Sequence, residues 1–86
     1  MGVGIAGLEN VARHDAAFAE RIRAAVLAAF RDLPPASSPT VLVAYDHVAA
    51  PGLAHLKLMW PNRVISLGLR SEMTQDELSR LVSAAL

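Results

Sequence analysis

The chain has 86 residues, of which 53% are hydrophobic, and eight basic side chains balance eight acidic ones. A chain of this length forms one domain, residues 1–86, and the zero net charge excludes the strongly basic surface typical of nucleic-acid and anionic-membrane binding. The sequence contains no cysteine, which excludes disulfides, thiolate catalysis and cysteine metal sites.

The composition also bears on where the protein resides. The longest uninterrupted apolar run, residues 24–30, is far shorter than the roughly 20 residues that a membrane-spanning helix needs. No basic region precedes the first apolar residues, so we expect no signal peptide and a cytoplasmic location.

A glycine-rich motif opens the sequence. Gly2, Gly4 and Gly7 have the spacing G-x-G-x-x-G, which binds dinucleotides when a strand leads into it and a helix follows. Only one residue precedes Gly2 in this sequence, so we expect no such strand and no bound cofactor. We predict instead that residues 1–8 form a flexible leader to a helix.

Residues 9–33 have the strongest helical pattern in the chain. Asn10 suits the N-cap position, and Pro34 ends the pattern. The helix also carries small residues off its apolar stripe, which reflect either helix propensity or a close helix–helix contact in a dimer. The predicted stripe comprises Val11, Phe18, Ile22, Val26, Phe30 and Leu33, and the candidate interface comprises Ala17, Ala24, Ala28 and, from a later strand, Trp60.

Three strands are predicted next, over residues 40–48, 53–60 and 63–69, because β-branched, aromatic and alternating apolar residues fill them. Pro51-Gly52 suits a type II turn between the first two. Pro61-Asn62 suits a tight reversal between the last two, since proline presets the first turn position and asparagine tolerates a left-handed conformation. The last two strands therefore form an antiparallel hairpin.

The sequence closes with a well-marked helix. Thr74 and Glu77 have the spacing of a capping box, in which each side chain binds a free backbone N–H. An apolar stripe of Leu78, Leu81, Val82 and Ala85 follows. The predicted fold is therefore α+β, with a long N-terminal helix, a three-stranded mainly antiparallel sheet with a hairpin, and a C-terminal helix.

Few residues are candidates for ligand contact. Asp46 and His47 follow the first long strand, and His55 and Lys57 lie on the polar face of the next one. An antiparallel pairing could bring His47 near His55, but the set matches no specific metal or acid–base motif, and a structural hydrogen-bonded pair explains it better. His14 is predicted to be exposed to solvent.

Residues 41–83 resemble a known family. The matching positions are Pro61-Asn62, Val64-Ile65, Ser66, Gly68-Leu69, Thr74, Asp76-Glu77-Leu78 and Leu81-Val82. They resemble the strand and helix that precede His-Glu-x-x-His in gluzincin zinc metallopeptidases of the heat-shock membrane protease and CAAX-protease kind. The resemblance would place the family's His-Glu pair on Ala84 and Ala85, and its second histidine beyond Leu86. It therefore implies a related scaffold that lacks the zinc site.

The sequence favours a small non-catalytic interaction or assembly module with no metal or cofactor. A short chain with a large apolar fraction is expected to bury surface in a partner, either as a homodimer or as a small accessory subunit of a larger protein. One alternative is a catalytically dead or truncated metallopeptidase-like domain. Another is a small-ligand or nucleic-acid-binding domain that uses His47, His55 and Lys57.

Overall fold

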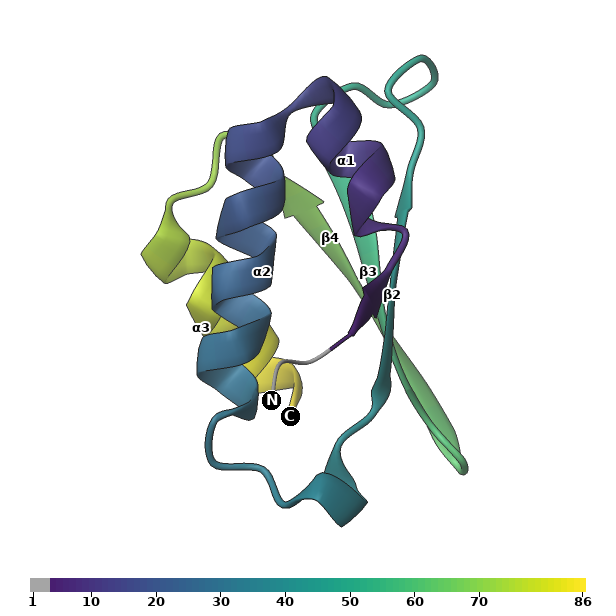
Figure 1. Ribbon diagram of the computed structural model, residues 1–86, viewed down its shortest axis with the longest axis vertical. Helices are drawn as coiled ribbons and strands as arrows, with labels where there is room; N and C mark the ends of the chain where they lie inside the picture. The colour runs from purple at the N-terminus through teal and green to yellow at the C-terminus, as the bar shows by residue number, and fades with distance from the viewer. Residues whose placement is uncertain (1–3) are drawn as a thin grey trace.

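The computed structural model describes residues 4–86, which form a layer of helices packed on one face of a four-stranded mixed sheet (Figure 1). The predicted α+β class is confirmed, but the sheet contains a fourth strand and the N-terminal helix is divided. The elements are β1 (Ile5–Ala6), α1 (Leu8–His14), α2 (Ala16–Phe30), a 3-10 turn (Pro35–Ser37), β2 (Thr40–Tyr45), β3 (Leu53–Trp60), β4 (Arg63–Arg70) and α3 (Gln75–Ala85).

The single helix predicted over residues 9–33 is wrong, because the chain breaks at Asp15. The Asp15 carboxylate accepts a hydrogen bond from the Phe18 N–H at 3.0 Å and so caps α2. The N-cap predicted at Asn10 is also wrong, since α1 begins directly after Gly7. The predicted apolar stripe nevertheless joins the core, because both short helices turn their apolar sides inward.

The start of the chain is more ordered than the sequence suggested. Ile5–Ala6 pairs in parallel with β2, placing Ile5 opposite Val41, and Leu8 is buried in the core. The predicted flexible leader is therefore wrong for residues 5–8, while the same prediction for residues 1–3 lies outside the described residues. Because β1 lies between Gly4 and Gly7, the strand lies within the glycine-rich motif and does not lead into it.

The remaining strands form an antiparallel meander in which each strand pairs with the next. The bounds predicted for β3, Leu53–Trp60, are confirmed. β2 ends at Tyr45 and not at residue 48, because the Asp46 carboxylate accepts hydrogen bonds from the N–H groups of Val48 and Ala49 and closes a turn.

The two reversals of the meander use different backbone geometry. In the first, Gly52 has a φ of 76° and the Leu53 N–H donates to the Ala50 carbonyl at 3.2 Å, as the type II prediction requires. In the second, the reversal predicted at Pro61-Asn62 is confirmed, but Asn62 does not adopt a left-handed conformation, because within residues 4–86 positive φ occurs only at Gly7 and Gly52.

The core lies between the helices and the inner face of the sheet. The capping box predicted for α3 is confirmed: the Thr74 hydroxyl accepts from the Glu77 N–H at 3.2 Å, and the Glu77 carboxylate accepts from the Thr74 N–H at 3.0 Å. The largest fully buried side chains come from all parts of the chain and include Phe18, Ile22, Leu56, Leu58, Leu69 and Leu78.

A polar link ties α2 to the connection between β4 and α3. The Arg21 guanidinium donates to the Ser71 carbonyl, and the Gln75 side-chain amide donates to the Arg21 carbonyl at 3.1 Å. Arg21 is half-buried, although it lies off the apolar stripe. These bonds fix where the chain leaves β4.

Candidate interaction site

β4 forms one edge of the sheet, and its outer side has no strand neighbour within residues 4–86. Just beyond β4, the Ser71 N–H donates to the Gly52 carbonyl on the β3 side at 2.8 Å. Backbone groups in an antiparallel strand alternate in direction, so every second residue back from Ser71 also bonds toward β3. The residues between them, Val64, Ser66 and Gly68, direct their N–H and C=O groups away from the sheet.

This edge lacks the features that protect strand edges in monomeric proteins. Such edges usually carry a proline, an interior charge, a bulge or a cover of other chain. β4 contains no proline, has its arginines only at its ends, Arg63 and Arg70, and pairs with β3 without interruption. The side chain of Val64 is 59% exposed. β4 is therefore a long, regular and accessible template for another strand.

The hairpin end of β4 is held from within the molecule. The indole N–H of Trp60 donates to the Ser37 carbonyl at 2.9 Å, and the Arg63 guanidinium lies over the Trp60 ring at 4.3 Å. Trp60, predicted as an interface residue, is thus half-buried and contacts Ser37 and Arg63 within the same molecule. These contacts position the tip of the β3–β4 hairpin, which reaches past the helical layer (Figure 1).

The opposite edge of the sheet is closed. β1 pairs with Val41 and Leu42, and the chain then turns at Gly7, which has a φ of 84°. A Cβ atom on Gly7 would overlap the Val43 carbonyl oxygen. Glycine is therefore required at position 7 for two structural reasons: its positive φ and its close approach to β2. Helix α1 follows at once and also contacts β2.

The sheet face turned away from the helices holds two of the predicted ligand contacts. His55 lies opposite Ala44, and Lys57 lies opposite Leu42, so both point to the outer face, where both are exposed. Neither residue has a hydrogen bond or ion pair described in residues 4–86. The two basic side chains therefore share the outer face of β3.

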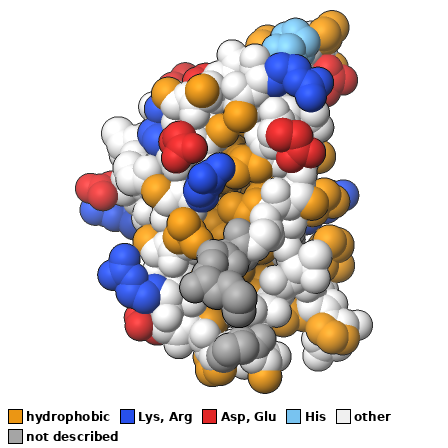
Figure 2. All heavy atoms as spheres, viewed as in Figure 1, with side chains coloured by type: hydrophobic (Ala, Val, Ile, Leu, Met, Phe, Trp, Pro, Cys, Tyr) orange, Lys and Arg blue, Asp and Glu red, His pale blue; other side chains and the backbone are white. Residues whose placement is uncertain are grey.

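The other two predicted contacts, Asp46 and His47, lie at the end of the molecule where α1 meets the loop after β2. His47 does not pair with His55; its ring stacks on His14 with 3.5 Å between ring centroids, and Tyr45 lies 6.3 Å from His14. Figure 2 shows histidine side chains gathered at this end. Sequence reasoning missed the stack because the two histidines are distant in sequence.

Asp46 forms its hydrogen bonds within the loop after β2. The backbone N–H groups of Ala49 and, to a lesser extent, Val48 hold the pKa of the Asp46 carboxyl below its ordinary value. An aspartate with these two bonds is a turn-forming residue. The structure therefore separates the four predicted contact residues into a turn, a ring stack and an open sheet face.

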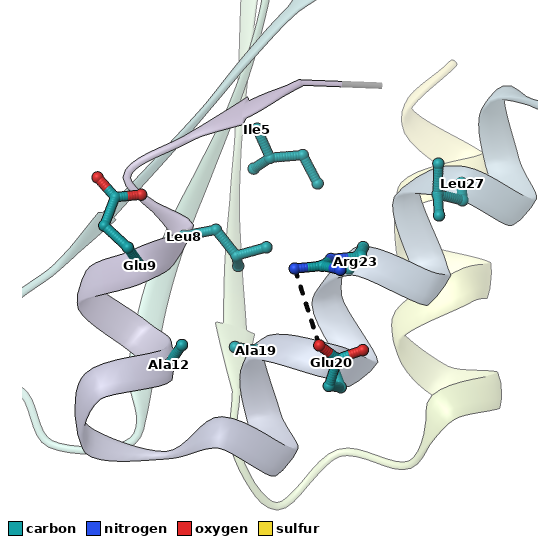
Figure 3. Close-up of a pocket in the computed structure, with 8 residues that line it drawn as sticks. All are labelled: Ile5, Leu8, Glu9, Ala12, Ala19, Glu20, Arg23 and Leu27. Atoms are coloured by element: carbon teal, nitrogen blue, oxygen red, sulfur yellow. Dashed lines mark ion pairs between the residues drawn. The ribbon is translucent and has the colours of Figure 1, made fainter. Parts of the chain in front are cut away.

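An apolar hollow of about 520 Å³ lies between the β1–α1 segment and α2. In Figure 3, Ile5, Leu8 and Leu27 line it, and an ion pair between Arg23 and Glu20 at 3.8 Å lies at its side. Figure 2 shows the corresponding strip of hydrophobic side chains between the helices. The hollow was not predicted, because it arises only when the helix divides and β1 joins the sheet.

The predicted interface alanines lie on α2, and the metallopeptidase positions lie at the end of α3. Ala17, Ala24 and Ala28 are all exposed on α2, so they remain available for contact. At the end of α3, Ala84 is exposed and Ala85 is half-buried against the core. Neither alanine can ligate a metal or activate water.

Neither the metal-binding side chains nor a comparison with known proteins identifies a further site. Within residues 4–86, no group of three or more histidine, cysteine, aspartate or glutamate side chains lies close enough to hold a metal ion. In the same part of the chain, no helix has both the length and the apolar character needed to cross a membrane. No family model, curated protein or solved structure matches the chain.

Proposed function

We propose that this chain is a small non-catalytic assembly module that works as a homodimer, with the outer edge of β4 as its contact surface. The observation that carries the proposal is that this edge is both long and unprotected. Eight residues, Arg63–Arg70, run without proline, bulge or interior charge. Edges of this kind pair with other strands when they meet them.

Strand pairing supplies a physical driving force. The outward N–H and C=O groups of Val64, Ser66 and Gly68 bind water in the monomer. Each exchange of water for a backbone partner contributes about 0.5–1.5 kcal/mol net. Val64 is 59% exposed, and covering an apolar side chain adds to this at about 25 cal/mol per Å². A domain of 86 residues benefits from such burial because its own core is small.

A second copy is favoured over an unrelated accessory partner because β4 complements itself. Its apolar inner residues, Ile65 and Leu67, are both half-buried, so they have surface left to cover. Antiparallel pairing of two identical strands produces a closed two-fold dimer. An accessory role beside a larger protein would use the same edge for a foreign strand, and the mass measurement below separates the two.

The test is the mass of the protein in solution at micromolar concentration, measured by sedimentation equilibrium. We expect a dimer for the natural sequence. Val64→Lys places a charge within the paired part of the edge, so the dissociation constant should rise at least about tenfold. The matched control is Val48→Lys, because Val48 is another exposed valine, 80% accessible, but lies in the loop after β2.

Two results would contradict the proposal. A natural sequence that stays monomeric throughout this concentration range would exclude the homodimer. A dimer that Val64→Lys and Val48→Lys weaken equally would exclude β4 as the contact. Circular dichroism of both variants should match the natural protein, because neither valine is buried in the monomer.

A further inference from the structure

From the backbone geometry of β4 we infer that two copies pair antiparallel about a two-fold axis at Ser66, so that Ser66 faces its own counterpart. The inference rests on the proposed function and specifies its geometry. Because the axis stands perpendicular to the sheet, the helices of both copies lie on the same face. Two four-stranded sheets then join into one continuous sheet.

The directions of the backbone groups exclude half of the possible registers. In an antiparallel pair, residues that exchange hydrogen bonds must both direct their N–H and C=O groups toward the partner. On β4 these outward residues are even-numbered: Val64, Ser66 and Gly68 are free at the edge. A register that places an even-numbered residue opposite an odd-numbered one forms no ladder. Arg63 of one copy therefore cannot lie opposite Arg70 of the other, which also avoids a like-charge contact.

Two of the remaining registers keep nearly all of β4 paired, one centred on Ser66 and one centred on Leu67. The second places Val64 opposite Arg70 and requires Arg70 to exchange backbone hydrogen bonds. The Arg70 carbonyl already accepts from the Met73 N–H at 3.1 Å, in the turn that leads to α3. The register centred on Ser66 uses only backbone groups that the monomer leaves free, so the geometry favours it.

The side chains agree with this register. On the helix side, Ile65 of each copy lies opposite Leu67 of the other, so that two half-buried apolar residues cover each other. On the outer face, the exposed Val64 lies opposite Gly68, which has no side chain to obstruct it. Each copy thus gains apolar contact on both faces of the joined sheet.

Cysteine cross-linking tests the register directly, because the natural sequence has no cysteine. The single variants are Ser66→Cys, Val64→Cys and Gly68→Cys, with Ser38→Cys in an exposed loop as the collision control. All three β4 positions point to the same face. A Cβ at Gly68 meets only the Leu53 side chain, at 3.7 Å, so this variant should fold.

We expect Ser66→Cys to form a disulfide dimer fastest under mild oxidation. Facing residues in a hydrogen-bonded pair have Cα atoms about 5.5 Å apart, within the range of a disulfide. Val64→Cys alone and Gly68→Cys alone should react no faster than Ser38→Cys, since their counterparts lie about 14 Å apart along the strand. An equal mixture of Val64→Cys and Gly68→Cys should cross-link, because those positions face each other.

The outcomes separate this inference from the proposed function. If Gly68→Cys alone, or an equal mixture of Ser66→Cys and Gly68→Cys, cross-links faster than Ser66→Cys alone, the register is wrong while the β4 dimer stands. If no β4 variant exceeds the Ser38→Cys control although sedimentation gives a dimer mass, the β4 contact is wrong while the homodimer stands. If sedimentation gives only monomer, both are wrong.

Discussion

The two edges of the sheet differ: one is covered by the β1–α1 segment, and the other is bare. At the β2 edge, the short strand β1 pairs with Val41 and Leu42, Gly7 packs against the Val43 carbonyl, and α1 follows directly. At the β4 edge, the outward backbone groups of Val64, Ser66 and Gly68 have no strand neighbour within residues 4–86. The chain thus uses a glycine with positive φ to close one edge and leaves a longer edge bare. This difference is the basis of the proposal that the bare edge pairs with a second copy.

The strongest test of the closed edge is Gly7→Ala. Alanine disfavours a φ of 84°, and its Cβ would overlap the Val43 carbonyl oxygen, so β1 and α1 must move away from β2. We expect the free energy of unfolding to fall by about 3 kcal/mol or more. Urea denaturation followed by circular dichroism measures this.

Gly4→Ala is the matched control, because nothing lies within 4 Å of a Cβ at Gly4. Its unfolding free energy should stay within about 0.5 kcal/mol of the natural value. Equal losses at Gly4 and Gly7 would show that the glycines act through chain flexibility and not through closure of the β2 edge.

The next test compares proline substitutions at two neighbouring positions of β4. Leu67→Pro removes an N–H that bonds to β3, so we expect a loss of about 3 kcal/mol. Ser66→Pro removes an N–H that points away from the sheet, so the dilute monomer should lose no more than about 1 kcal/mol. Sedimentation of the Ser66→Pro variant should nevertheless show only monomer, because the substitution removes an N–H that the dimer needs. Equal destabilisation of the two monomers would contradict the assignment of inward and outward groups.

A smaller effect is expected where the chain leaves the open edge. Arg21→Ala removes the donor to the Ser71 carbonyl, and the unfolding free energy should fall by about 1–2 kcal/mol. The control is Arg23→Ala, whose ion pair with Glu20 is exposed and contributes at most about 0.5 kcal/mol. If the two variants have the same stability, the Arg21 bond does not hold the end of β4.

The smallest effect concerns the helix that follows the open edge, and it depends on pH. The Thr74 backbone N–H, and then its hydroxyl, hold the pKa of Glu77 below its ordinary value of 4.5. Its stabilising contribution is therefore present above pH 4.5 and lost as the pH falls through the lowered pKa. The melting temperature of Glu77→Gln should therefore fall less than that of the natural protein as the pH is lowered below 4.5. If both proteins lose stability equally with acid, the capping box is not the source of the loss.

Local patterns predicted the parts of the fold that depend on neighbouring residues. β3 was located by the alternation of buried Leu56 and Leu58 with exposed Lys57, and α3 by the Thr74–Glu77 spacing. The break at Asp15 was missed because the apolar stripe continues across it, although an aspartate three residues before Phe18 is itself a capping signal.

Contacts between distant segments could not be predicted in the same way. β1 has only two residues and forms by parallel pairing with β2, which leaves no local pattern. The stack of His14 on His47 requires α1 and the β2–β3 loop to meet. The candidate site depends on strand order: the sequence predicts β4 as a strand, but only the fold shows that it lies at an edge.

Amide hydrogen exchange, followed by NMR over a series of protein concentrations, tests most directly whether β4 is the associating edge. The N–H groups of Ile65, Leu67 and Leu69 bond within the monomer, so their protection should be present at every concentration. Those of Val64, Ser66 and Gly68 should exchange rapidly in dilute solution and become protected as the dimer forms. Rapid exchange at these three amides in a sample that sedimentation shows to be dimeric would contradict the account.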